Sequence, residues 1–260
     1  MKHNQNTQEL VKTDAKINLG IPLYPTFDSL DVLGPLQVFS YAPNISVSLI
    51  AATLDAVTSL EGVRILPDLT FDCFADPESA NLDVLFVPGG ADIVSPLQQG
   101  PLGQNEFLDF LVSQAQHAQL VCSVCTGALL LGAAGLLDGH VATTHWTQLG
   151  TLQLFPCTVA AGYPRYVYSG NRITGGGISS GIDEAFYIVS LLSGVEAAKE
   201  CQLKMQYRPE PPFHTGDPAD SDIWKHPLLP EQIMQQWGVS ETREAYKAWL
   251  TSQSHAAAEA

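Results

Sequence analysis

Residues 120–132, LVCSVCTGALLLG, carry the pattern that decides the fold of this chain. Residues 120–124 are apolar, short and rich in β-branched side chains, which predicts a buried strand. An apolar helix pattern then begins near Thr126, runs to Leu137 and stops just before a glycine. Cys125 stands between the two, so the sequence predicts a cysteine at an abrupt strand-to-helix turn.

Two roles for Cys125 follow from this position. The N-terminus of a helix offers unpaired N–H groups and partial positive charge, which favour a thiolate over a thiol. Cys125 is then a nucleophile whose pKa is lowered. Alternatively it is a small buried apolar residue, as most free cysteines are. The local sequence leaves both roles open.

The composition describes a chain that can bury a substantial core and that carries a strong negative charge. Of its 260 residues, 45% are hydrophobic, the formal net charge is -15 and the pI is about 4.6. This charge argues against nucleic acid and anionic membrane surfaces as partners. No apolar run reaches the ~18 residues of a membrane span. We therefore expect a protein that binds neither.

The chain divides into three segments. Residues 1–16 are polar without an apolar stretch, which predicts a disordered N-terminal tail and not a signal peptide. Residues 17–208 form the main α/β domain. Residues 209–260 begin with a proline-rich stretch and continue as a loop-plus-helix extension that packs on the main domain or on a partner subunit.

The cysteines favour a reducing compartment. There are five, an odd number at wide spacing, as expected for a cytoplasmic protein without a disulfide framework. Cys122-x-x-Cys125 could be a redox or zinc motif, but it has no second pair and no histidine pair at metal-ligand spacing. We expect no metal site.

Predicted strands alternate with predicted helices along the main domain. Strand patterns at residues 17–23 and 83–87 are each followed by a helix pattern, at residues 29–38 and 105–117. This alternation predicts an α/β fold, a mostly parallel sheet sandwiched by helices. In such sheets the reactive groups gather where strands end. The turn after Leu23, the Pro88-Gly89-Gly90 turn and the Cys125 turn share that location.

Five motifs in this order resemble the ThiJ/PfpI superfamily, a branch of the flavodoxin-like, class I glutamine-amidotransferase-like fold. The motifs are Val87-Pro88-Gly89-Gly90, Val124-Cys125-Thr126-Gly127, Thr143-Thr144-His145-Trp146, Thr174-Gly175-Gly176-Gly177 and Gly181-Ile182-Asp183. The similarity covers about residues 17–212. Within the superfamily, residues 30–35 (LDVLGP) and 207–213 (YRPEPPF) are most similar to the isonitrile hydratases. Those enzymes are hydro-lyases that add water to an isonitrile, R–N≡C, and give an N-substituted formamide.

The resemblance implies roles for particular residues. Cys125 matches the nucleophile, Asp31 the acidic residue beside it, and Thr126 a residue that shapes the site. Backbone N–H groups of Gly89 or Gly90 are expected to flank the reacting atom, and Ile178 and Ser179 to line the substrate site. The resemblance also implies a homodimer.

The implied chemistry uses no metal and no organic cofactor. A soft thiolate attacks the isonitrile carbon, while Asp31 first delivers a proton and then activates water as general base. An acid with a raised pKa beside a thiol with a lowered pKa can cycle one shared proton. Thr126 follows Cys125 where a histidine might stand, which argues against a Cys–His dyad.

Alternative roles remain for several of these residues. Asp31 could serve only as a helix N-cap, with Asp28 as a turn residue. His145 could be a catalytic base, although a packed structural histidine is the more common outcome. Residues 175–180 imitate a dinucleotide fingerprint, but the third position is serine and no acidic residue is suitably placed, so we expect close packing instead.

Two other functions compete with isonitrile hydration. One is a different cysteine-dependent enzyme of the superfamily that acts on a reactive carbonyl such as a glyoxal. The other is a non-catalytic sensor, because related domains form the ligand-sensing part of some transcription regulators. Such regulators carry a basic helix-turn-helix region after this domain, whereas residues 209–260 have three basic and eight acidic side chains.

Overall fold

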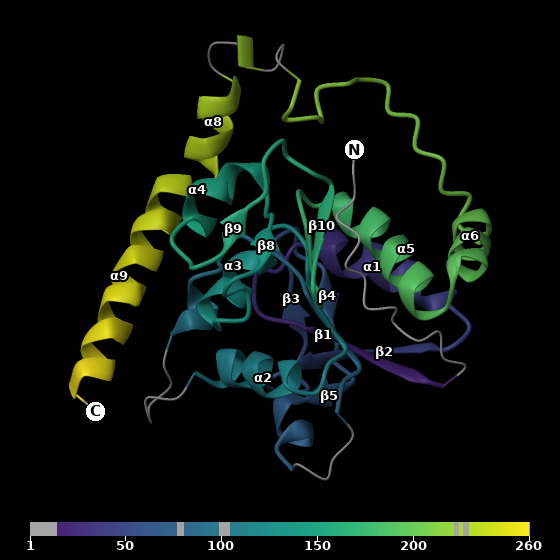
Figure 1. The fold of residues 1–260 in the computed structure, drawn as a ribbon, viewed down its shortest axis with the longest axis horizontal. Helices are drawn as coiled ribbons and strands as arrows, with labels where there is room; N and C mark the ends of the chain where they lie inside the picture. The colour runs from purple at the N-terminus through teal and green to yellow at the C-terminus, as the bar shows by residue number, and fades with distance from the viewer. Residues whose placement is uncertain (1–14, 77–80, 99–104, 221–223, 226–228, 260) are drawn as a thin grey trace.

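A seven-stranded sheet forms the centre of the molecule in the computed structural model, which describes residues 15–76, 81–98, 105–220, 224–225 and 229–259 (Figure 1). In spatial order its strands are β10 (Tyr166–Ser169), β11 (Arg172–Gly175), β7 (Leu120–Ser123), β6 (Val84–Val87), β1 (Ile17–Pro22), β2 (Ile45–Ala51) and β5 (Leu69–Thr70). Neighbouring strands are parallel except for β10 and β11. The mostly parallel sheet expected from the sequence is confirmed.

Helices cover both faces of this sheet. On one face lie α1 (Ser29–Ser40), α5 (Ser180–Leu192) and α6 (Val195–Lys204), and on the other lie α2 (Glu106–Ala115) and α3 (Gly127–Ala133) (Figure 1). Strands β6 and β7 are buried at every position because both of their faces are covered. No helix in the described part of the chain is long and apolar enough to cross a membrane.

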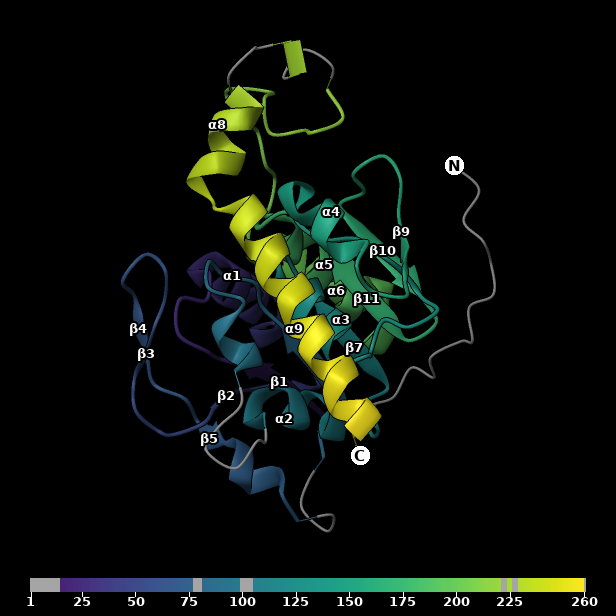
Figure 2. The same cartoon turned by 90° about the vertical axis from the view of Figure 1, so that its left-hand side faces the viewer.

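Smaller elements decorate the sandwich. They are the hairpin β3 (Val57–Thr58) and β4 (Arg64–Ile65), the parallel pair β8 (Val141–Ala142) and β9 (Thr158–Val159), α4 (Leu149–Leu152), and the 3₁₀ turns Phe71–Phe74, Ser95–Leu97 and Trp146–Gln148. Figure 2 shows the β3–β4 hairpin extending away from the body of the molecule. Helices α8 (Leu229–Gln236) and α9 (Val239–Glu259) follow last, and α9 crosses outside α3 (Figure 2).

The structure can be compared with the three segments expected from the sequence. Residues 1–14 of the predicted tail lie outside the described residues, and β1 begins at Ile17. After α6 the described chain adds no further strand. Tyr246 of α9 is fully buried, so the C-terminal extension packs against the main body of its own chain.

The four central strands bring their carboxyl ends to one edge. Strands β11, β7, β6 and β1 are consecutive in the sheet. The segments that follow them therefore meet, because parallel strands end on the same side. These are the turns after Leu23, at Pro88-Gly89-Gly90, at Cys125 and at Gly176–Ser179.

The turn at Cys125 is left-handed. Its φ of 55° lies in a region that side-chain-bearing residues rarely adopt and that costs about 1–3 kcal/mol. Two hydrogen bonds fix it: Cys125 N–H donates to the Gly176 carbonyl at 2.8 Å, and Thr144 Oγ1 donates to the Cys125 carbonyl at 2.8 Å. The predicted strand-to-helix junction is therefore held by two other motifs of the sequence.

The helix after this turn is shorter than predicted. It ends at Ala133 and not at Leu137, because Gly135 turns the chain with a φ of 70°. Leu137 is nevertheless fully buried. The apolar pattern up to Leu137 therefore predicted burial correctly, but it did not predict where the helix ends.

Helix α3 can begin directly behind Cys125 because Gly127 has no side chain. A Cβ at this position would overlap the Val87 carbonyl oxygen and lie 2.8 Å from that of Pro88. These carbonyls belong to the last residue of β6 and to the residue directly after it, which cannot move without disturbing the sheet. The close approach of α3 to this strand end therefore requires glycine.

We predict that Gly127→Ala destabilises the fold by about 1–3 kcal/mol or more, because overpacking against backbone cannot be relieved by a rotamer change. The thermal midpoint should fall by several degrees, at roughly 2–4 °C per kcal/mol for a chain of this size. Gly216→Ala is the matched control, since a Cβ there meets nothing within 4 Å. Equal melting temperatures for the two variants would contradict the prediction.

Candidate active site

A cavity of about 390 Å³ opens over the carboxyl ends of the central strands. Cys125, Thr126, Gly90 and Ile178 all line it, although they come from three different turns. Apolar side chains make up much of the remaining wall: Leu60, Ala91, Ile93 and Trp237. The polar contribution comes from Asp28, Thr147, Gln148 and Gln236. A cysteine in a small, largely apolar cavity is the chemical centre of this arrangement.

Asp31 lies behind Cys125, completely buried in the first turn of α1. Its Oδ2 accepts a hydrogen bond of 2.9 Å from Gly89 N–H. Its carboxyl also interacts with the Cys125 thiol, and Oδ1 has no hydrogen-bonding partner among the described residues. The predicted cysteine–acid juxtaposition is therefore present.

Asp28, and not Asp31, caps helix α1. Its Oδ1 accepts a hydrogen bond of 3.0 Å from Leu30 N–H, one of the unpaired donors at the helix start. Asp28 also lines the cavity. Asp31 is thus not needed as a cap, and its buried carboxyl is available to the thiol.

The N–H groups of the glycine turn after β6 were expected to flank the reacting atom, but they bind protein side chains. Gly89 N–H donates to Asp31, and Gly90 N–H donates to Thr126 Oγ1 at 2.9 Å. Thr126 Oγ1 in turn donates to the Gly90 carbonyl at 3.0 Å. Because both N–H groups have protein partners, they do not form an oxyanion site; they hold the acid and the threonine in place.

The N–H groups that face the thiol belong to other residues. Thr126 and Ile178 direct their backbone N–H groups at Cys125, where both favour a thiolate. The first belongs to the start of α3, as the sequence suggested. The second lies in the turn before α5, which a local sequence pattern could not place beside Cys125.

The pKa of Cys125 moves in the direction opposite to that expected. Burial first, and the charge of Asp31 second, raise the pKa of the thiol well above its usual range, and the two N–H groups only partly oppose this. Burial and then the charge of Asp28 likewise raise the pKa of Asp31. Two such groups in contact retain at least one proton at neutral pH. The pair therefore stores a proton between a thiol and a carboxyl.

His145 stands beside the site and not in it. Its Nδ1 lies 2.8 Å from Thr147 Oγ1, and burial lowers its pKa to about 4. It does not line the cavity, and its ring packs against Gly177. A neutral, packed histidine agrees with the structural alternative.

Ser179 also lies elsewhere. It is exposed and accepts a hydrogen bond of 3.0 Å from Arg165 Nη1, and it is not part of the cavity wall. Ile178 is the residue of this pair that reaches the site. The glycine-rich turn itself serves close packing, since a Cβ at Gly176 would lie 3.1 Å from the Pro164 carbonyl oxygen.

Sequence reasoning missed several residues near the site. Leu60, Gln148, Gln236 and Trp237 line the cavity from segments that no motif marks. Glu184 of α5 is completely buried, and neither of its carboxyl oxygens has a partner among the described residues. Burial, and secondly the charge of Asp31, raise its pKa well above the usual range. The sequence around Glu184 predicts a helix but does not indicate that this carboxyl is buried.

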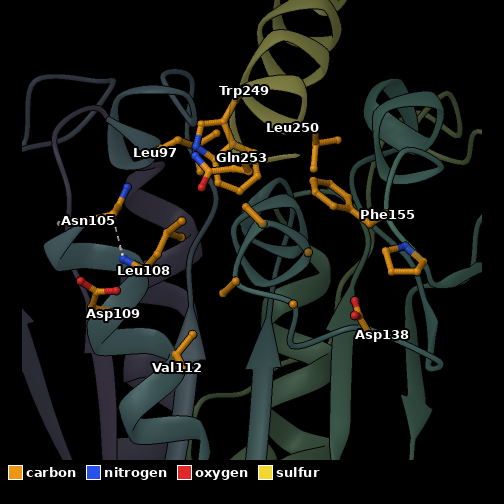
Figure 3. A pocket seen from close by; sticks show the side chains of 15 residues that line it. Leu97, Asn105, Leu108, Asp109, Val112, Asp138, Phe155, Trp249, Leu250 and Gln253 are labelled. Atoms are coloured by element: carbon orange, nitrogen blue, oxygen red, sulfur yellow. Dashed lines mark hydrogen bonds between the residues drawn. The ribbon is translucent and has the colours of Figure 1, made fainter. Parts of the chain in front are cut away.

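A larger hollow of about 620 Å³ lies between α2, α3 and α9 (Figure 3), and Cys125 does not line it. Apolar side chains such as Leu108, Phe155 and Trp249 form much of its wall. It holds no cysteine or histidine. Across the described residues, no three His, Cys, Asp or Glu side chains are grouped to hold a metal ion. The reactive groups are thus in the smaller cavity.

Comparison with known proteins places the chain in a family. Residues 19–191 match the DJ-1/PfpI family, and the chain belongs to it. Among its relatives is an isonitrile hydratase of Pseudomonas putida, 43% identical over 206 residues, which are 78% of this chain and 83% of that protein. A ThiJ/PfpI family protein from Pseudomonas syringae has a similar structure, with a TM-score of 0.77, 31% identity and 90% of each chain covered.

A regulator is also among the relatives. The HTH-type transcriptional regulator GbdR of Pseudomonas aeruginosa is 30% identical over 141 residues. The match covers 54% of this chain but only 35% of the regulator. Most of the regulator thus has no counterpart in this match, and it gives less support for function than the hydratase.

We predict that Asp31→Asn shifts the pH profile of Cys125 alkylation to lower pH. The carboxylate raises the thiol pKa, so removing its charge lets the thiolate form at lower pH. The measurement is the iodoacetamide rate from about pH 6 to about pH 10, read at the Cys125 peptide by mass spectrometry.

Asp28→Asn is the control for this experiment. Asp28 also raises the Cys125 pKa, but more weakly than Asp31 does, so its variant should give a smaller shift in the same direction. An unchanged or upward-shifted profile in Asp31→Asn would show that the two groups do not repel as described.

Proposed function

We propose that this protein is an isonitrile hydratase that converts R–N≡C and water into an N-substituted formamide. The observation that carries the proposal is the contact between the buried Asp31 carboxyl and the Cys125 thiol at a small, largely apolar cavity. The 43% identity to a protein named isonitrile hydratase supports the same reaction. An uncharged substrate suits a cavity with this lining.

The first half of the reaction forms a bond to sulfur. The Cys125 sulfur attacks the terminal carbon of the isonitrile, and the proton shared with Asp31 passes to that same carbon. The product is a thioimidate, R–N=CH–S–Cys125, and Asp31 is left as a carboxylate. A pair that retains one proton at neutral pH supplies both the nucleophile and the acid for this step.

The second half releases the formamide. The Asp31 carboxylate removes a proton from water, whose oxygen adds to the thioimidate carbon, and Asp31 passes that proton to the nitrogen, which becomes N–H. The hydroxyl proton of this adduct then returns to Asp31, the C–S bond breaks, and R–NH–CHO leaves. The thiolate and the protonated acid are restored, so no redox change or cofactor enters the balance.

Thr126 and Ile178 support these steps by position. Their N–H groups face the sulfur and stabilise its negative charge when it attacks and when it leaves. The Thr126 hydroxyl fixes the Gly90 turn, which in turn keeps Gly89 N–H on Asp31. A single hydrogen-bonded unit therefore orients both reacting groups.

The arrangement disfavours a Cys–His mechanism. His145 does not line the cavity, and its Nδ1 is engaged with Thr147. We further propose a reducing compartment such as the cytoplasm, because all five cysteines are free, including the exposed Cys73.

The central prediction is turnover of an aryl isonitrile to its formamide, followed by chromatography of the product. Cys125→Ala should show no turnover above the uncatalysed rate, since no other thiol lines the cavity. Asp31→Asn should lose about 10²–10⁴-fold in kcat, the usual contribution of a general acid–base. Cys122→Ala is the matched control, because this neighbouring cysteine is buried in β7 and should leave turnover intact.

Three outcomes would overturn the assignment. They are absence of turnover by the wild type, undiminished turnover by Cys125→Ala, and enzymatic turnover of methylglyoxal in place of isonitriles. The last outcome would assign the chain to the carbonyl-directed enzymes of the superfamily.

We propose in addition that two copies of the chain associate. Leu30 and Leu33 of α1 are exposed, as are Val63 and Leu66 in and beside the β3–β4 hairpin. The hairpin tip lies against the start of α1, because Leu60 N–H donates to the Phe27 carbonyl at 2.9 Å. Exposed apolar side chains thus lie on two neighbouring elements, which suits a self-complementary interface.

Light scattering after size-exclusion chromatography should therefore give twice the chain mass of 28.0 kDa. Leu66→Glu, at a side chain that is 69% exposed, should weaken the dimer by placing a charge in the interface. Leu203→Glu on α6, where the leucine is 80% exposed, is the control and should leave the mass unchanged. A monomeric wild type, or dissociation only in the control, would refute this interface.

A further inference from the structure

The end of α8 reaches the cavity that holds Cys125. Gln236, the last residue of α8, and Trp237 both line this cavity, more than 100 residues away from Cys125 in the chain. Gly238 then turns the chain into α9 with a φ of 57°. Part of the wall around the proposed nucleophile is thus supplied by the C-terminal extension.

Helix α9 fixes this wall to the body of the molecule. Tyr246 is completely buried, its hydroxyl donates to the Ile93 carbonyl at 2.9 Å, and its ring meets Phe155 edge-on at 5.7 Å. Ile93 itself lines the cavity. Trp249 and Leu250 extend from the same helix over the hollow that Phe155 borders (Figure 3). Helix α9 therefore holds the C-terminal extension against the main domain both at the Cys125 cavity and at the larger hollow.

Trp237 is placed to contact whatever enters the cavity. Its ring centroid lies 4.7 Å from that of His145, at an angle of 44°. Burial lowers the His145 pKa to about 4, so Trp237 rests on a neutral ring and not on a cation. His145 in turn packs against Gly177, next to the Ile178 N–H that faces Cys125. Trp237 nevertheless remains 46% exposed, so much of its surface is open to contact.

The linear shape of an isonitrile determines which part of the substrate contacts Trp237. An isonitrile is linear at its reacting end, and its terminal carbon must reach the buried Cys125 sulfur. The substituent R therefore points outward, toward Leu60 and Trp237, two lining side chains that are partly open to solvent. Aromatic rings attract one another beyond the burial of area, in offset or edge-on contact.

We propose that Trp237 is a specificity-determining residue, which forms the outer wall of the Cys125 cavity and selects isonitriles with an aromatic substituent over saturated ones of similar size. The proposal rests on the proposed isonitrile hydration. It assigns to the C-terminal extension a part of the substrate site that no motif of the main domain supplies.

The test compares phenyl isonitrile with cyclohexyl isonitrile in the wild type, Trp237→Ala, Trp237→Phe and Trp224→Ala. Trp237→Ala should raise KM for the phenyl substrate about 3–10-fold, change kcat by less than about twofold and lose the preference for it. Trp237→Phe should restore most of the preference. Trp224→Ala should match the wild type, because Trp224 is similarly exposed in the same extension but packs on Trp146 and does not line the cavity.

Two results would overturn the proposal. One is an unchanged phenyl-to-cyclohexyl preference in Trp237→Ala. The other is an equal loss of kcat for both substrates without a change in KM, which would indicate a structural role for the tryptophan.

A second readout separates this inference from the hydratase assignment. N-phenyl and N-cyclohexyl chloroacetamide alkylate a cysteine without requiring hydration, and intact mass reports the rate at Cys125 against a Cys125→Ala blank. Faster labelling by the phenyl reagent in the wild type, lost in Trp237→Ala, supports the aromatic wall even when no isonitrile turns over. Equal rates for the two reagents in the wild type would refute it.

Discussion

The left-handed turn at Cys125 is the constraint on which the rest of the site depends. A side-chain-bearing residue with a φ of 55° persists only where the surroundings hold it. Here the holders are the Gly176 carbonyl and the Thr144 hydroxyl, from two separate segments. The glycine at position 127 is the third condition, because only a residue without Cβ lets α3 begin against the end of β6. The turn thus links the motifs that the sequence shows separately.

The electrostatics of the site follow from this geometry. By placing the sulfur near a buried carboxyl, the turn creates two acids whose pKa values are both raised, that of Cys125 by burial and the charge of Asp31, and that of Asp31 by burial and the charge of Asp28. The helix N-terminus and the Ile178 N–H only partly offset this. Such a pair does not present a free thiolate to solvent. It presents a nucleophile together with the proton that its product requires, which is the combination an isonitrile carbon needs.

Much of this could be predicted from local patterns. Alternation of short apolar strands with helices gave the parallel sheet, and the strand-to-helix junction gave the elbow at Cys125. Asp31 was identified by resemblance and not by its own surroundings. Predictions were less accurate where they needed a partner in space: the Gly89 and Gly90 N–H groups bind Asp31 and Thr126, and Ser179 binds Arg165. Hydrogen-bond partners far apart in the sequence leave no local signal.

The sequence by itself determined the α/β class and the elbow, because each is encoded by periodicity or by a short motif, whereas the pairing of Cys125 with Asp31 was implied by the family resemblance. Only the tertiary structure decided the sign of the Cys125 pKa shift, since burial and contact with Asp31 are properties of the folded chain. It also decided that Trp237 closes the cavity wall, because α9 returns the C-terminal extension to the sheet edge. The turn at Cys125 could therefore be predicted from the sequence, whereas the groups that surround its thiol are brought together only by the fold.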